Sequence, residues 1–370
     1  MNGPGALPIL LAGVMLVSLN AYVLMGGADF GGGVWDLLAT GERCDRQRDL
    51  IAHAIGPIWE ANHVWLILVV VLLFTCFPPA FATLAIVLHV PLALMLIGIV
   101  LRGSAFTFRT YGGDEVAAQR RWGRMFAIAS TITPVLLGIC IGAVASLRVG
   151  EAAQRIAAAP RAMGAEVRVG ESFSSLYIAP WLTPFAVGVG LLALALFAFL
   201  AATYLTLEAP DEELREDFRR RALAAAAAVF VIAFGVLIVA RLTTPPRGAP
   251  PLAALTARWW ALPLHLLTGL AAIGAIWALV ARRWRLARVA AAAQVTLILW
   301  GWALAQYPYL VPPELTIGGA AAPRRTLVLA LWALAIGAVL LIPSLAYLFG
   351  IFTGAPQAFG HMDRAVERRE

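Results

Sequence analysis

The sequence contains no lysine, and only 13% of its 370 residues are charged. The missing lysine excludes a phosphate-binding loop of the Gly-Lys-Ser/Thr type, although glycines cluster at residues 26–33. Cysteines are scarce as well, because Cys44, Cys76 and Cys140 are isolated and form no Cys-x-x-Cys pair. Three isolated cysteines predict packing residues rather than a disulfide framework.

Apolar residues make up 61% of the chain, and the mean hydropathy is +0.83. This apolar content is more than the core of a soluble protein can bury, so part of the surface must face lipid. In lipid every backbone N–H and C=O needs a partner within the protein, which leaves helices or a closed barrel. The apolar runs are too long and too continuous for barrel strands. The sequence therefore predicts an all-α fold, a polytopic transmembrane helical bundle.

A transmembrane helix needs about 20 apolar residues to cross about 30 Å of hydrocarbon. The chain supplies nine such stretches, near residues 8–39, 51–77, 80–104, 122–147, 178–206, 222–243, 261–281, 288–308 and 327–353. The first stretch lacks a cleavage pattern and is predicted to be a retained helix. We expect one integral membrane domain over residues 1–370. Two four-helix bundles, about 8–147 and 178–308, with a peripheral ninth helix at 327–353, would suit the helix count.

The arginines predict an orientation, since all 28 basic residues are arginine. Nineteen of them fall on the side that a nine-helix topology assigns to the odd-numbered loops and the C-terminus: Arg43, Arg46, Arg48, Arg102, Arg109, Arg120, Arg121, Arg124, Arg215, Arg219, Arg220, Arg221, Arg282, Arg283, Arg285, Arg288, Arg364, Arg368 and Arg369. The positive-inside rule then places the N-terminus outside and the C-terminus in the cytoplasm. The pI of about 9.9 is explained by these topology-setting arginines, which favour anionic headgroups over nucleic acid as partners.

Two acidic residues lie inside the first two predicted spans. Asp29 lies about ten residues before the inner end of the first span, and Glu60 about ten residues into the second, so each is about 15 Å from the inner surface. A charge at the centre of a helix costs about 2.5–3.5 kcal/mol on insertion scales, so such residues usually have a function. We expect these neighbouring carboxyls to accept and release protons. The glycines around Asp29 are expected to allow close approach by another helix or a flat ligand.

Glu60 belongs to a polar group in which Trp59, Asn62 and His63 share one helix face. The group could equally be a hydrogen-bonded cluster that only fixes helix packing. A di-iron site would need a second Glu-x-x-His pair, which the sequence lacks. The remaining histidines lie at unrelated depths, which favours local hydrogen bonds over haem ligation.

Four segments resemble subunit II of the cytochrome bd-type quinol oxidases, including their cyanide-insensitive branch, over essentially the whole chain. They are Gly27-Ala28-Asp29-Phe30-Gly31-Gly32-Gly33, Gly56-Pro57-Ile58-Trp59-Glu60-Ala61-Asn62-His63-Val64-Trp65-Leu66, Leu101-Arg102-Gly103 through Phe106-x-Phe108-Arg109, and Gln306-Tyr307-Pro308-Tyr309-Leu310 with Leu315-Thr316. The second segment is the most specific. The resemblance implies a multi-pass protein of the bacterial cytoplasmic (inner) membrane.

The resemblance further implies a heterodimer with a subunit I that carries the quinol site, the b-type haems and the d-type haem. That complex oxidises quinol and reduces oxygen to water with protons from the cytoplasm. This chain is then expected to hold no cofactor or metal through its side chains and no catalytic residue of its own, and it would stabilise subunit I. A structural quinone or lipid and a small accessory subunit are left open.

By the same resemblance, Glu60 is expected to relay protons, with Asp29 and His63 on the proton route. Trp59, Asn62 and Arg102 are expected to face subunit I or its haems. Arg102 could equally be a positive anchor at the inner end of its helix. Two other functions remain open, a purely structural subunit and a proton-coupled transporter, although a transporter usually shows repeats that this sequence lacks.

Overall fold

The computed structural model describes residues 5–55, 59–111, 116–158, 172–243, 255 and 258–353. The elements are α1 (Ala6–Leu37), α2 (Cys44–Ile55), α3 (Trp59–Cys76), α4 (Pro78–Val87), α5 (His89–Tyr111), α6 (Val116–Ala145), α7 (Arg148–Ala158), α8 (Phe173–Tyr177), α9 (Pro184–Glu208), α10 (Glu212–Thr243), α12 (Ala261–Val280), α13 (Trp284–Gln306), β1 (Tyr309–Val311), β2 (Leu315–Thr316) and α14 (Arg324–Thr353). The two strands pair antiparallel. The chain divides into two compact units, Met1–Ala322 and Pro323–Glu370, and the second contains α14.

The helices confirm the predicted fold class. Among the described residues, eight helices are long and apolar enough to cross a membrane: α1, α5, α6, α9, α10, α12, α13 and α14. The broken pair α3 and α4 raises the number to as many as nine. The chain therefore has the composition and the helix lengths of a multi-pass membrane protein.

Two of the predicted spans each cover parts of two helices. The second was expected to begin at residue 51, but residues 44–55 form the separate helix α2 and α3 begins at Trp59. The third was expected to begin at residue 80, but α4 is a short helix bent by 116° from α3, and α5 begins only at His89. Pro78 and Pro79 explain this break, because proline lacks a backbone N–H and clashes with the preceding helical turn. The same residues suit the first turn of α4.

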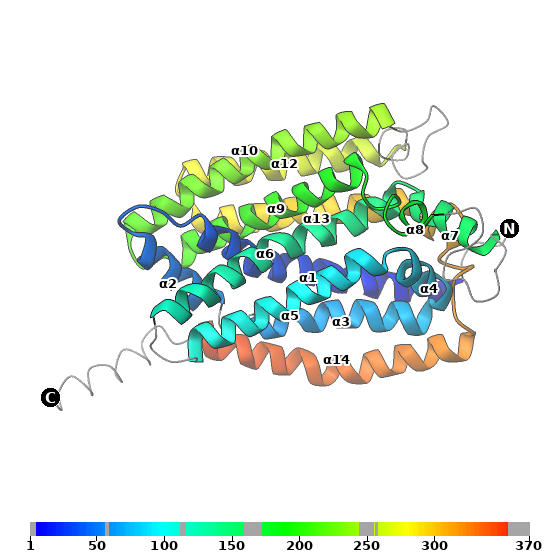
Figure 1. Ribbon diagram of the computed structural model, residues 1–370. Helices are drawn as coiled ribbons and strands as arrows, with labels where there is room; N and C mark the ends of the chain where they lie inside the picture. The colour runs from blue at the N-terminus through cyan, green and yellow to red at the C-terminus, as the bar shows by residue number, and fades with distance from the viewer. Residues whose placement is uncertain are drawn as a thin grey trace. The chain divides into compact units, whose positions relative to one another are not determined.

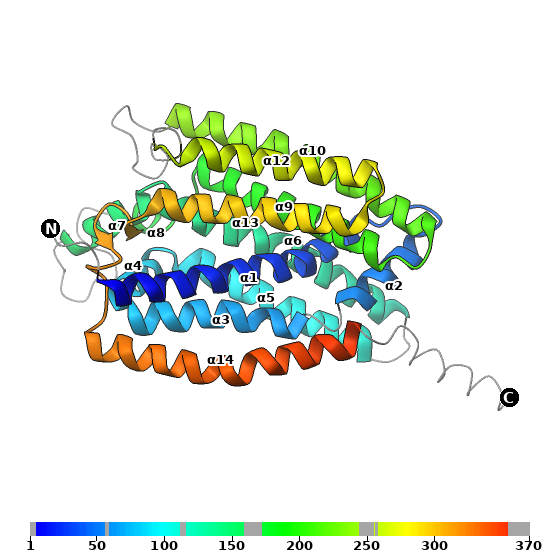
Figure 2. The same cartoon turned by 180° about the vertical axis from the view of Figure 1, so that it is seen from behind.

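Helix α9 lies at the centre of the first unit, where it packs against α10, α6 and α1 (Figures 1 and 2). Small residues let α6 and α9 approach closely: a Cβ added to Gly138 would lie only 2.7 Å from the Cα of Gly190. Lipid tails are as apolar as leucine, so helices in a membrane associate mainly through close packing of this kind. The glycines of α6 and α9 thus fix the central helix pair.

Different elements mark the two ends of the first unit. Helix α2 and the first turns of α10 lie at one end, and α4, α7 and α8 lie at the other (Figures 1 and 2). The arginine-rich segments that the positive-inside rule assigns to the cytoplasm include α2 and the start of α10. We call this end the α2 end; its orientation toward the cytoplasm stays a prediction.

Candidate functional site

Asp29 is buried in the interior of α1, with 2% of its surface exposed. Its Oδ1 forms an ion pair with Arg102 of α5, and its Oδ2 accepts a hydrogen bond from Nδ2 of Asn62 on α3 at 3.2 Å. Three helices thus bring one carboxylate, one guanidinium and one amide together. A charge in this position needs such partners, because the surrounding hydrocarbon cannot solvate it.

Arg102 is as deeply buried as Asp29, with 1% of its surface exposed. Its Nε donates to the Ser130 hydroxyl on α6 at 3.0 Å, and its guanidinium lies 4.6 Å from the ring centroid of Phe30 and 5.1 Å from that of Phe126. Its Nη1 has no hydrogen-bond partner among the described residues. The aromatic faces attract the cation, so Arg102 is held by charge, hydrogen bond and ring contacts together.

Glycines of α1 make room for this cluster. A Cβ on Gly26 would lie 3.0 Å from Nδ2 of Asn62, and one on Gly33 would collide with the Ser130 side chain. On the side facing α9, a Cβ on Gly31 would collide with the Phe197 carbonyl. The expectation that the glycine run allows close approach by another helix is confirmed.

The structure places the other predicted site residues in different ways. His63 follows Asn62 on α3, and its ring centroid lies 6.3 Å from that of Tyr22 and 6.4 Å from that of Phe30. Trp59 and Glu60 are the first two residues of α3, but their side chains lie outside the described residues. Glu60 is the second described residue of α3, and its role on a proton route stays a prediction.

The interior position of Asn62 and Arg102 also differs from expectation. The resemblance implied that both face a partner subunit, but both are buried within this chain. The physical reason is the charge of Asp29, which an interior guanidinium neutralises at short range. Arg102 therefore meets a carboxylate of its own chain and is not the surface anchor of the alternative interpretation.

A second ion pair lies two helical turns further along the same helices, and the sequence reasoning missed it. Asp36 of α1 is buried, and its Oδ1 lies 3.2 Å from Nη1 of Arg109 on α5 and 4.0 Å from Nε of Arg48 on α2. Asp36 follows Asp29 by seven residues, and Arg109 follows Arg102 by seven. This shared offset is visible in the sequence and is the signal that could have found the pair.

A cleft of about 520 Å³ opens beside Asp36 at the α2 end. Its lining comes from α1, α2, α5 and α6 and is rich in charge: Asp36, Asp45, Arg48, Asp49, Arg109, Arg120 and Arg124, with Leu37, Gln119, Gly123 and Ala127. The Asp36–Arg109 pair therefore lines a cleft, whereas the Asp29–Arg102 pair is enclosed within the chain.

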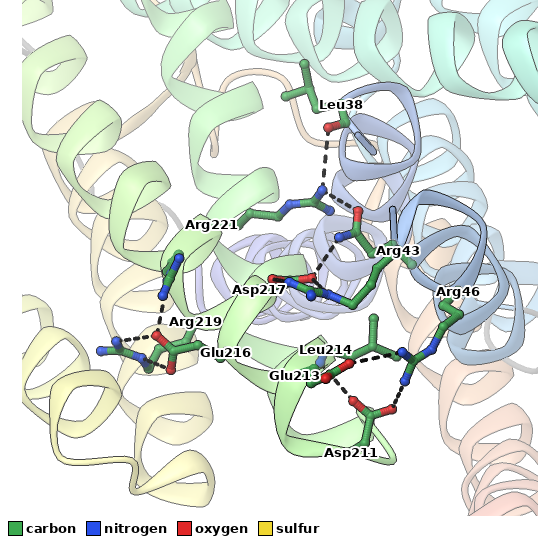
Figure 3. Close-up of polar contacts among 12 residues, drawn as sticks. Leu38, Arg43, Arg46, Asp211, Glu213, Leu214, Glu216, Asp217, Arg219 and Arg221 are labelled. Atoms are coloured by element: carbon green, nitrogen blue, oxygen red, sulfur yellow. Dashed lines mark hydrogen bonds and ion pairs between the residues drawn. The ribbon is translucent and has the colours of Figure 1, made fainter. Parts of the chain in front are cut away.

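A polar network joins the α2 region to α10 at the same end (Figure 3). Arg43 donates two hydrogen bonds to Asp217, at 2.9 and 2.7 Å, and Arg46 reaches Asp211 at 2.6 Å and Glu213 at 3.1 Å. The hydrogen bonds that Arg43 donates to Asp217, together with the carboxylate charge, raise the pKa of Arg43. The sequence reasoning used these arginines only for topology and did not predict their partners.

Asp211 also caps α10, because its Oδ1 accepts a hydrogen bond from the backbone N–H of Leu214 at 2.9 Å. This hydrogen bond, followed by the charge of Arg46, holds the pKa of Asp211 below its ordinary value. The first turn of α10 and its contact with α2 thus share one carboxylate.

The described histidines do not gather around a common centre. The Nδ1 atom of His89 lies 2.9 Å from the Ile86 carbonyl, and that of His265 lies 2.5 Å from the Ala261 carbonyl. Among the described residues, no group of three or more His, Cys, Asp or Glu side chains is placed to hold a metal ion.

The family profile described as cytochrome bd terminal oxidase subunit II matches residues 7–352. The chain belongs to this family. The predicted resemblance is thereby confirmed, and with the apolar helices it makes the chain a multi-pass protein of the bacterial inner membrane.

Curated relatives carry subunit 2 names. Cytochrome bd ubiquinol oxidase subunit 2 of Bacillus subtilis is 29% identical over 126 residues, which cover 34% of this chain and 36% of the relative. Cytochrome bd-I ubiquinol oxidase subunit 2 of Escherichia coli K12 is 29% identical over 133 residues, 36% of this chain and 34% of the relative. The aligned parts span about a third of each relative.

The fold matches a solved structure over nearly its full length. The bd oxidase from Geobacillus thermodenitrificans gives a TM-score of 0.72 at 22% identity, covering 94% of this chain and 99% of the matched chain. This similarity shows that the two chains share a fold.

Proposed function

We propose that this chain is the haem-free subunit II of a bd-type terminal quinol oxidase and forms a heterodimer with a haem-bearing subunit I. The family membership and the names of the curated relatives support this proposal. The complex oxidises quinol and reduces oxygen to water, and this chain stabilises subunit I and lines a cytoplasmic proton route. The b-type and d-type haems of the partner supply the electron transfer.

The observation that carries the proton-route proposal is the buried cluster of Asp29, Arg102 and Asn62. Asn62, which binds Asp29, lies in the first turn of α3, and Glu60 precedes it by two residues. The backbone of Glu60 is therefore within one helical turn of this cluster. In the proposal Glu60 relays protons, Asp29 anchors the polar end of the route and His63 lies beside it. Arg102 holds the Asp29 side chain in place through their ion pair.

The contacts of two histidines favour placing the haems in the partner. His89 and His265 lie against carbonyls of their own neighbourhood, so their contacts are local. A haem iron would need an axial histidine, methionine, cysteine or tyrosine facing an open cavity.

A purely structural role is the second candidate, and one observation favours it. Asp29 and Arg102 neutralise each other inside one chain, which is what a cluster that only fixes helix packing would show. The family membership disfavours the third candidate, a proton-coupled transporter.

Glu60→Gln in the co-expressed complex separates a relay from a structural role. A relay predicts unchanged haem spectra with quinol-dependent oxygen uptake lowered about tenfold or more, because a positioned proton-transfer group contributes at least that much. Glu42→Gln, at an exposed position of the loop before α2, is the matched control and should leave uptake unchanged. Loss of the haem bands in Glu60→Gln would instead support the structural role, and full uptake would exclude the relay.

A further inference from the structure

Among the described residues, one more arginine than aspartate lines the charged cleft at the α2 end. Four arginines and three aspartates line it: Arg48, Arg109, Arg120 and Arg124, with Asp36, Asp45 and Asp49. Asp36 pairs with Arg109 and approaches Arg48, which also lies 4.0 Å from Asp45. Arg120 and Arg124 are exposed and form no ion pair among the described residues. The cleft therefore presents cationic groups that an anion could neutralise.

A glycine on α6 leaves room for a third guanidinium beside those of Arg120 and Arg124. Gly123 lies between Arg120 and Arg124 on α6, and a Cβ added there would lie 3.8 Å from Nη1 of Arg109. Because residue 123 has no side chain, Arg109 of α5 can lie across α6 at this point. Three guanidinium groups from two helices thus line one cleft, an arrangement suited to a phosphate group.

An aromatic pair beside the cleft indicates that the cleft lies at the level of the membrane headgroups. Phe108 of α5 and Trp122 of α6 stack beside it, with ring centroids 4.7 Å apart. Aromatic side chains of this kind gather where the hydrocarbon ends and the headgroups begin.

One ridge of α6 leads from the arginines into the apolar part of the helix. Arg120, Arg124, Ile128 and Ile132 follow one another at four-residue spacing, and Ile128 and Ile132 are 50% and 51% exposed. The neighbouring α5 exposes Ile97 and Leu101. Cationic groups at one end and exposed aliphatic groups along the same ridge match the two parts of a phospholipid.

We propose that this cleft binds the phosphate headgroup of an anionic phospholipid of the inner leaflet, with one acyl chain lying along Ile128 and Ile132. The site rests on the proposed cytoplasmic orientation of the α2 end. Basic recesses between transmembrane helices on the cytoplasmic side are suited to anionic headgroups, and each arginine near the surface strengthens the attraction. A zwitterionic lipid offers the same acyl chains without the net charge and binds more weakly.

The test uses the purified heterodimer in nanodiscs that contain phosphatidylglycerol and phosphatidylcholine, with bound lipids counted by native mass spectrometry. Arg120→Gln/Arg124→Gln should lose the bound phosphatidylglycerol, with an affinity about 30-fold lower. Arg120→Lys/Arg124→Lys keeps the charge and should retain the lipid. The control Arg121→Gln/Arg285→Gln removes two exposed arginines that do not line the cleft and should retain the lipid as well.

Equal phosphatidylglycerol retention in all variants would overturn the proposal. So would a thermal stabilisation of the complex by inorganic phosphate as large as that by phosphatidylglycerol, because the site would then recognise a soluble anion. Assembly and oxygen uptake of each heterodimer are recorded in parallel. A chain that forms no heterodimer contradicts the proposed function, whereas an intact, active heterodimer without selective lipid retention contradicts only the lipid site.

Discussion

Asp29 and Arg102 form the most deeply buried ion pair among the described residues. Taking two charges out of water is costly, and their attraction repays the cost only when hydrogen bonds satisfy the remaining atoms. Asn62 and Ser130 supply such hydrogen bonds here. The pair is therefore better understood as a means of fixing one geometry than as a large source of stability.

A double-mutant cycle tests this interpretation of the pair. Asp29→Asn leaves the Arg102 charge unpaired, and Arg102→Met leaves the Asp29 charge unpaired, so each should destabilise the complex by about 3–5 kcal/mol. Asp29→Asn/Arg102→Met combines the two changes, removes both charges and should cost less than either single variant. Thermal unfolding of the heterodimer in detergent measures this, and a double variant that costs the sum of the two singles would contradict it.

Sequence reasoning reached part of this cluster. The shared depth of Asp29 and the first turn of α3 was foreseeable from span lengths, and Asn62 does bind Asp29. The Arg102 pairing was not foreseeable, because a sequence does not specify which helices are neighbours. The seven-residue offset from Asp29 to Asp36 predicts a second ion pair only once it is known that side chains of α1 and α5 contact each other.

At the scale of elements, close packing between α1 and α9 depends on glycine. Gly31→Ala places a Cβ against the Phe197 carbonyl and should destabilise the protein by about 1–3 kcal/mol, as overpacking does. Gly13→Ala is the control on the same helix, since nothing lies within 4 Å of the added Cβ. It should be neutral or slightly stabilising. Equal thermal midpoints for the two variants would show that the α1–α9 approach is looser than described.

The start of α10 should respond to acid through Asp211. Its pKa is lowered in the folded protein, so its stabilising effect is complete above the ordinary carboxyl value of 3.8 and is lost as the pH falls below that value. The protection factors of the first amides of α10, which are corrected for the intrinsic pH dependence of exchange, should therefore fall on acidification in this range. Asp211→Asn keeps a capping side chain without the charge and should remove the pH dependence. Exchange that changes with pH identically in both proteins would contradict the assignment.

Helix positions were predictable where one apolar run makes one helix. The stretch 261–281 corresponds to α12 at Ala261–Val280 almost residue for residue. The prediction was wrong where a polar helix leads into an apolar one, as α2 does before α3, because hydropathy does not show the change. It was also wrong for the stretch 80–104, which is not one helix, because α4 ends at Val87 and α5 begins at His89.

At the scale of the whole molecule, the topology is the first property to test. A reporter that is active only in the cytoplasm should be active when fused after Glu370, and a reporter active only outside should be inactive there. The network of Arg43, Arg46 and their acidic partners would then lie in the cytoplasm. The opposite result would invert the membrane orientation and remove the basis of the inner-leaflet lipid site.

The central claim is that this chain completes a bd-type oxidase whose haems lie in another subunit. The most direct measurement compares membranes that contain this chain alone, subunit I alone, and both, by visible difference spectra and by quinol-dependent oxygen uptake. The account predicts a d-type haem band and oxygen uptake only when both chains are present. Haem bands from this chain alone, or uptake by subunit I that is unchanged without it, would contradict the account.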